Sequence, residues 1–235
     1  MQDKKTAYKR QSKRHEPKGL AVLYEDQDII VVNKVNGLLT VSTDRERDKT
    51  AHYLLNEYVK KGNARSRNRV FIVHRLDRDT SGILVFAKSE KVKRALQDQW
   101  SSFTKKYFAV VHGKLLEKEG IITSYLTENR AHRMYSTKDT EKGKLSKTGY
   151  KLLKEGRGFS LLEISLFTGR KNQIRVHFFD KGHPVVGDKL YGNVDKWAKR
   201  LALHAASLTI LHPHSKEKMN FEAEMPSYFK DLIKA

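Results

Sequence analysis

The sequence HRLDRDTSGILVFAKS, residues 74–89, places a densely charged loop directly before an apolar strand. An apolar run, VFIV, leads into the loop, so we expect one strand over 70–74 and another over 82–88. Two Arg, two Asp and one His crowd the connection, although a plain loop needs only turn residues. The loop is therefore a candidate functional site, with solvated ion pairs of little energetic weight as the alternative.

The segments around this loop alternate short β-rich runs with amphipathic helical patterns. We expect further strands over 20–24, 28–34, 105–113, 147–156, 159–167 and 203–213, and helices over 51–59, 90–103 and 171–181. Residues 114–145 are polar and predict a surface insertion with one short strand. This pattern predicts an α+β fold with a mixed, mostly antiparallel central sheet and flanking helices, in one domain over 19–235.

The net charge favours a polyanionic partner. Lys and Arg number 47 against 27 Asp and Glu, which leaves +20, whereas solubility needs only about 2–8 charges. Nucleic acid is the first candidate, because a basic surface releases counterions from phosphates. An anionic membrane would need a basic amphipathic helix with a large apolar face, and none stands out. Residues 1–18 carry +5 and little apolar surface, so we expect a disordered basic arm.

Several function classes are excluded by composition. The chain has no Cys, so disulfides, thiolate metal sites and a thiol nucleophile are impossible. The ten His are scattered without an HExxH pattern, and we expect no metal. The first residues lack the apolar core of a signal peptide, and no run of eighteen apolar residues occurs. We expect a soluble cytoplasmic protein.

Two other segments supply candidate site residues. KKYFAVVHG places Tyr107 in a strand, where its ring could stack on a base or simply fill the core. TGRKNQIRVHF places Arg170 before a helix, where phosphate binds favourably, and Arg175 inside the helix between apolar neighbours. A partly buried arginine needs an anion, and the conspicuous carboxylates are Asp77 and Asp79.

The chain resembles the RluA-type pseudouridine synthases. The resemblance rests on VVNKVNGLLTV, HRLDRDTSGILVFAKS, KKYFAVVHG, TGRKNQIRVHF, GHPVVGDKLYG and LHAASLTILHP, in this order over about residues 28–213. It implies a pseudouridine synthase fold with an active-site cleft, and cofactor-free isomerisation of uridine to pseudouridine in RNA. Ribosomal RNA is the expected substrate more than tRNA, and we expect a monomer. Many relatives carry an extra N-terminal S4 domain, but the expected strands begin near residue 20 here, so we expect a short form without it.

The resemblance also implies roles for residues. Asp77 matches the family's nucleophile, Tyr107 the tyrosine that stacks on the target base, and Arg175 the arginine that pairs with the nucleophile. The expected RNA contacts are Arg75, which matches a residue implicated in displacing the target base, together with Arg78, Arg170, Lys171 and Asn172. Two departures are visible: NKVNG stands for the common NKPxG, and GRKNQ for the common GRTHQ.

Two rival functions remain open at this point. A glycosidase-like hydrolase would use Asp77 and Asp79 as paired carboxylates. A non-catalytic RNA-binding module would keep the fold without the chemistry. Release of free uracil would identify the hydrolase, and binding without conversion the module.

Overall fold

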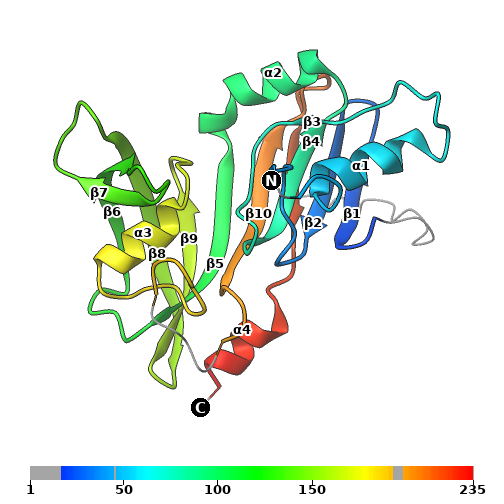
Figure 1. Cartoon of the computed structure of the whole chain (residues 1–235). Coiled ribbons are helices and arrows are strands. Elements are labelled where there is room, and N and C mark those ends of the chain that lie inside the picture. Colours follow the sequence, from blue (N-terminus) through cyan, green and yellow to red (C-terminus); the bar gives the residue numbers. More distant parts are fainter. Residues whose placement is uncertain (1–16, 45, 193–197, 235) are drawn as a thin grey trace.

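One mixed sheet of eleven strands runs through the structure, a computed structural model that describes residues 17–44, 46–192 and 198–234 (Figure 1). The strands follow the order β1-β2-β4-β10-β5-β9-β8-β6-β7, with β3 added to β4 and β11 to β10. Their bounds are β1 (Leu20–Glu25), β2 (Ile29–Lys34), β3 (Phe71–Ile72), β4 (Ser81–Ala87), β5 (Thr104–His112), β6 (Glu119–Glu128), β7 (Met134–Thr137), β8 (Lys144–Gly156), β9 (Phe159–Leu166), β10 (Leu203–Leu211) and β11 (Lys218–Glu222).

The strand pairing confirms the predicted fold class. β4 and β10 pair in parallel, and the other pairs of described strands are antiparallel. The helices are α1 (Ala51–Lys60), α2 (Glu90–Asp98), α3 (Gln173–Asp180) and α4 (Ser227–Leu232). The chain is therefore an α+β protein built on a mixed, mostly antiparallel sheet.

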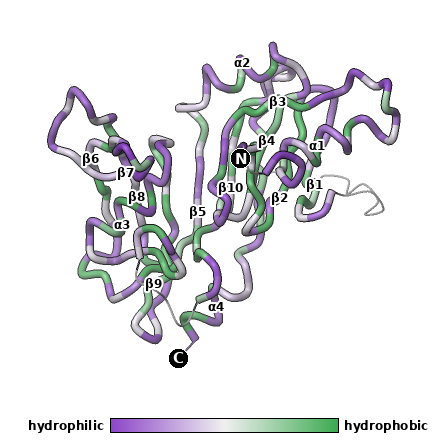
Figure 2. The backbone as a smooth tube through the Cα atoms, viewed as in Figure 1, coloured by the Kyte–Doolittle hydropathy of each residue, from purple (hydrophilic) through white to green (hydrophobic). Residues whose placement is uncertain are grey.

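Helices α1 and α2 cover opposite faces of the same part of the sheet. β4 is buried along its whole length, so its alternate side chains enter two cores: Leu84 packs in one with Leu55 of α1, and Val85 in the other with Val92 of α2. Figure 2 shows the hydrophobic stretches concentrated in the strands and the hydrophilic ones in the outer loops. The charged loop before β4 is thus anchored on a strand packed from both sides.

The start of α2 matches the sequence prediction, and its end does not. The Ser89 side chain accepts a hydrogen bond from the backbone N–H of Val92, as expected of an N-cap. The α-helix stops at Asp98, and Trp100 begins a short 3-10 turn that leads to β5. Trp100 and Phe103 therefore lie beyond the α-helix that was expected to carry them.

The expected surface insertion over 114–145 is wrong. β6, β7 and the start of β8 extend the main sheet to its outer edge beside α3 (Figure 1). Ile122, Leu126 and Met134 are buried there, and the residues between them on the strands are half-buried or exposed. A strand with one solvated face has few apolar residues, which is why the segment looked irregular. β11 and α4 were not predicted.

The expected basic arm over 1–18 lies outside the described residues apart from Pro17 and Lys18. The assignment of 19–235 to one catalytic domain stays a prediction. Among the described residues, no helix has both the length and the apolar character needed to cross a membrane.

Candidate active site

The loop that carries Asp77 is fixed by buried hydrogen bonds. Thr40, which is buried, donates from Oγ1 to the Leu76 carbonyl at 2.7 Å and accepts from the Leu76 N–H at 3.2 Å. The Gly37 N–H donates to the Arg78 carbonyl at 2.9 Å, and the Asn36 side chain donates to the Asp79 carbonyl. Thr40 thus holds the backbone just before Asp77, and the NKVNG segment holds the backbone just after it.

Lys34 completes this clamp from inside the protein. Its side chain is fully buried, and Nζ donates to the carbonyls of Val35 at 3.1 Å, Leu38 at 2.8 Å and Arg78 at 3.1 Å. Burial lowers the pKa of Lys34 to about 8, although the negative charges of Asp79 and Asp77 oppose the shift. A buried lysine therefore ties the two loops together without a direct carboxylate contact.

The pH dependence of folding should reveal Lys34. Its folded pKa lies below the usual 10.5, so between about pH 8 and about pH 10 the unfolded chain binds more protons than the native one. Wild-type stability should therefore rise across this window relative to Lys34→Met, which should be less stable throughout because three carbonyls each lose a hydrogen bond. Urea unfolding at several pH values measures the difference in the free energy of unfolding between wild type and Lys34→Met. A difference that stays constant from about pH 8 to about pH 10 would refute the lowered pKa.

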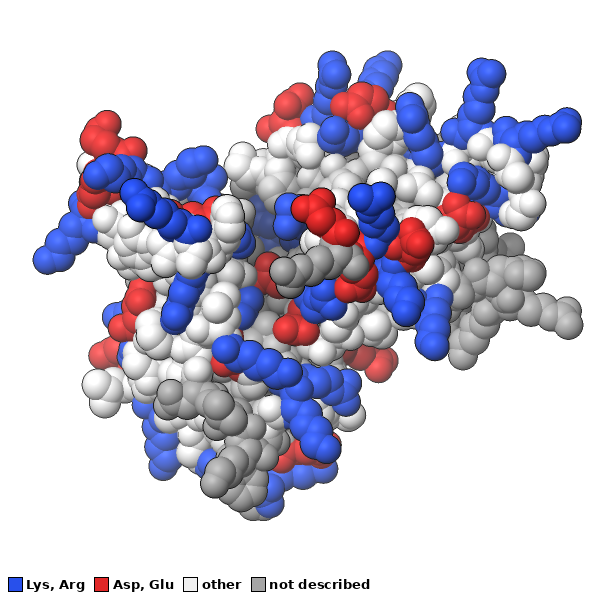
Figure 3. Space-filling view, in the orientation of Figure 1, with Lys and Arg blue, Asp and Glu red and all other residues white. Residues whose placement is uncertain are grey.

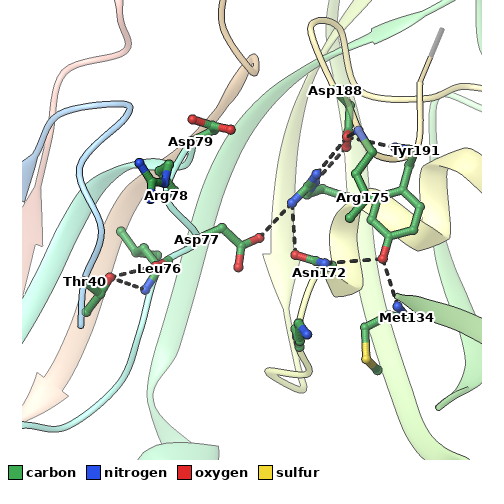
Figure 4. Close-up of polar contacts among 12 residues, drawn as sticks. Thr40, Leu76, Asp77, Arg78, Asp79, Met134, Asn172, Arg175, Asp188 and Tyr191 are labelled. Atoms are coloured by element: carbon green, nitrogen blue, oxygen red, sulfur yellow. Dashed lines mark hydrogen bonds and ion pairs between the residues drawn. The ribbon is translucent and has the colours of Figure 1, made fainter. Parts of the chain in front are cut away.

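Arg175 joins Asp77 to a second, deeply buried carboxylate. Its Nη1 lies 3.2 Å from Asp77 Oδ2, and its Nε and Nη2 each donate to Asp188 at 2.7 Å (Figure 4). The Asp188 side chain is 0% exposed, that of Arg175 11% and that of Asp77 34%. Asp77 is therefore the accessible end of a chain of charges whose other end is closed to solvent.

The charges of this group support one another. Burial alone would lower the pKa of Arg175, but the hydrogen bonds and charges of Asp188 and Asp77 outweigh it and raise the pKa. Burial opposes ionisation of Asp188, but Arg175 and the backbone N–H groups of Leu190 and Tyr191 hold its pKa below the usual value. Arg175 is therefore a permanent cation aimed at Asp77.

Asn172 holds the guanidinium from the helix start. Its Oδ1 accepts from Arg175 Nη1 at 3.0 Å, and its Nδ2 donates to the Tyr191 hydroxyl at 3.3 Å. The Tyr191 ring lies under the guanidinium, 5.2 Å from its carbon. Asn172 was expected to contact RNA, and that contact stays a prediction; in this structure its side chain orients the arginine. Its φ of 53° is a left-handed conformation that asparagine tolerates.

Tyr107 lies in the same cleft, on β5. Its side chain is almost fully buried, and burial together with the negative charge of Asp77 raises the pKa of its phenol. The hydroxyl is therefore protonated at neutral pH. The cleft that Tyr107 and Asp77 line has a volume of about 520 Å³.

The expected RNA contacts divide between the cleft and the outside. Arg75, Arg170, Lys171 and Asn172 line the cleft. Arg78 does not, because its guanidinium points away from Arg175 (Figure 4). It pairs with Glu46 at 2.8 Å. Figure 3 shows Lys and Arg side chains projecting from both halves of this face of the molecule. A larger hollow of about 760 Å³ between α4 and the β8–β9 turn contains none of the predicted site residues.

Asp79 does not join Asp77 in the cleft. It is absent from the described lining residues, and in Figure 4 it lies on the far side of the loop from Arg175. Asp77 and Asp79 therefore do not form a pair of carboxylates that faces one substrate. This removes the structural basis of the hydrolase hypothesis.

Comparison with known proteins identifies the family. The sequence profile described as RNA pseudouridylate synthase matches residues 28–179. The chain is 36% identical over 220 residues to the uncharacterized RNA pseudouridine synthase YhcT of Bacillus subtilis, covering 92% of this chain and 72% of that protein. The chain belongs to the RNA pseudouridylate synthase family. It is an isomerase that acts on RNA.

Other members of the family agree. The ribosomal large subunit pseudouridine synthase D of Nitrosomonas europaea is 35% identical over 237 residues, covering 96% of this chain and 67% of that protein. The solved structure of human RNA pseudouridylate synthase domain containing 1 superposes with a TM-score of 0.74 at 28% identity, over 92% of this chain and 87% of that one. The synthase resemblance found in the sequence is thereby confirmed, and so is the fold.

Proposed function

We propose that this synthase isomerises specific uridines in structured RNA, with Asp77 as the nucleophile. The observation that carries the proposal is the Arg175 guanidinium, which binds Asp77 Oδ2 and is itself locked by Asp188. Oδ1 of Asp77 has no hydrogen-bond partner among the described residues. One oxygen is thus held by the protein while the other faces the cleft.

The reaction suits a carboxylate that is held in a fixed position at the wall of a cleft. The N1–C1′ bond must break, and the uracil must turn and rejoin through C5 without escaping. A carboxylate can attack C1′ or assist elimination to a glycal, and Arg175 stabilises its ionised form either way. The side chains of the cleft cannot reach a base that is stacked inside an RNA helix, so the uridine must flip into the cleft. Tyr107, Arg175 and Asp77 are the groups proposed to contact it.

Ribosomal RNA is the favoured substrate, with tRNA as the alternative. Two relatives, from Nitrosomonas europaea and Zymomonas mobilis, carry the name ribosomal large subunit pseudouridine synthase D. The net charge of +20 suits a large structured RNA. Mapping pseudouridines across all RNAs of a deletion strain, with and without a plasmid copy, tests this. We expect loss and recovery at a ribosomal position, whereas a change confined to tRNA would overturn the choice.

Substitutions of Tyr107 separate stacking from proton transfer. Tyr107→Phe keeps the ring but loses the hydroxyl, so the single-turnover rate should fall by about 10²-fold or more. Tyr107→Ala should lose more, because stacking is lost as well. Tyr150→Phe, on β8 outside the cleft lining, is the matched control and should behave as wild type. If Tyr107→Phe is as fast as wild type, the hydroxyl takes no part in the chemistry.

A further inference from the structure

Lys105 occupies an unusual place in the cleft. It stands two residues before Tyr107 on β5, so both side chains point to the same face of the strand and both line the cleft. Lys105 is nevertheless 7% exposed. Its neighbour Lys106 points to the opposite face.

The ammonium group of Lys105 lacks an anion. Nζ donates to the Trp100 carbonyl at 2.7 Å and lies 5.6 Å from the Trp100 ring centre, and no described carboxylate forms an ion pair with it. The His74 ring stacks on the Trp100 ring, with the two ring centres 4.3 Å apart. Burial, together with the charge of Lys105, lowers the pKa of His74 to about 3. Burial likewise lowers the pKa of Lys105. The cation therefore has one carbonyl and neutral rings around it.

A buried charge without a partner is costly, and such charges are normally paired. Lys105 has further N–H donors beyond the one that Trp100 uses. A lysine ammonium binds phosphate as a compact point charge. The two strand positions are about 6.6–6.8 Å apart, so an anion at Lys105 would lie next to a base seated at Tyr107.

We propose that Lys105 and the rim formed by Trp100 make a subsite for the backbone phosphate adjacent to the target uridine. This inference rests on the proposed function, because it places the uridine at Asp77 and Tyr107. The phosphate would complete the coordination of Lys105, and the bound strand would run past Trp100 and Gln97 at the edge of the same cleft.

Lys106 provides a matched control on the same strand. Its Nζ pairs with Glu163 at 2.8 Å, and its side chain is 43% exposed. Kd and kcat/KM are measured on an RNA fragment carrying the mapped uridine. Lys105→Gln should raise Kd and lower kcat/KM, each by about tenfold or more, which is the effect expected from losing a hydrogen bond to a charged group. Lys105→Arg should recover part of the loss, and Lys106→Gln should stay within about twofold. Equal small effects of both glutamine variants would overturn the proposal.

The phosphate itself is tested by replacing single linkages near the uridine with neutral methylphosphonates. One linkage should weaken wild-type binding and have no further effect on Lys105→Gln, because the partner is already gone. If every linkage has the same effect in both proteins, Lys105 contacts no phosphate. Lys105→Met should melt within a few degrees of wild type, since it removes a desolvated charge. A large loss of thermal stability would assign Lys105 to the fold instead.

Affinity for a short oligouridylate separates this inference from the proposed function. If wild type binds it through Lys105 but converts no uridine in any RNA, the proposed function fails while the subsite stands. If wild type converts its RNA and Lys105→Gln matches it in affinity and kcat/KM, the subsite fails while the function stands.

Discussion

Asp77→Asn should abolish uridine conversion while RNA affinity stays within a few fold of wild type. The amide keeps the shape of the side chain but cannot attack C1′ or carry the negative charge. Losing a nucleophile costs at least about 10⁴-fold in rate in well-studied enzymes. Affinity should persist because phosphate contacts from the basic surface supply most of it. Single-turnover conversion and a binding titration on the same RNA give both numbers.

Asp79→Asn is the matched control for this prediction. The residue stands two positions further along the same loop but lies outside the cleft lining. Its conversion rate should remain within a few fold of wild type. Turnover of Asp77→Asn close to wild type in a contamination-free preparation would remove Asp77 from the chemistry, and loss of activity in both variants would point to the loop's fold.

Arg175→Met should cost both stability and activity. Removing one partner of a buried ion pair typically costs about 3–5 kcal/mol, because the other charge stays buried alone. Here two carboxylates lose their cation, and the Asp188 side chain is fully buried. Activity should collapse because nothing then holds Asp77. Urea unfolding measures the stability, and Arg170→Met, an exposed arginine before the same helix, should leave it unchanged.

The pH dependence of that stability loss has a defined sign. In wild type the lowered pKa of Asp188 contributes stability above about pH 4 that is lost as the pH falls through the folded value. In Arg175→Met burial raises the pKa of Asp188, so the variant folds more readily when that carboxyl is protonated. The difference in the free energy of unfolding between wild type and Arg175→Met should thus narrow from neutral pH toward about pH 4. A pH-independent difference would mean that the pKa of Asp188 does not depend on Arg175.

Several residues of the site could be predicted from the sequence because charged residues interrupt otherwise apolar patterns. Asp77 stands out in a loop between two apolar strands, and Arg175 between Ile174 and Val176 implied a buried partner. The expected contact is present, at 3.2 Å. Fold class followed from the same alternation of apolar runs and turn signals.

The rest depended on tertiary contacts that local patterns do not encode. Asp188 follows a glycine turn after α3. Only the folded structure shows that Asp188 accepts two hydrogen bonds from Arg175, whereas Asp77 accepts one. A buried arginine could have prompted a search of GHPVVGDKLYG for that second carboxylate. Nothing in the sequence marks Lys34 or Lys105 as buried, because a lysine's exposure depends on what packs over it.

The most direct test of the account is a product analysis. Purified wild-type protein is incubated with RNA from the deletion strain in the presence of a chelator, and pseudouridine and free uracil are quantified by mass spectrometry. The account predicts that pseudouridine appears at the mapped position, that no uracil is released, and that Asp77→Asn yields neither. Uracil release with an abasic site, or RNA binding with no pseudouridine at all, would contradict it.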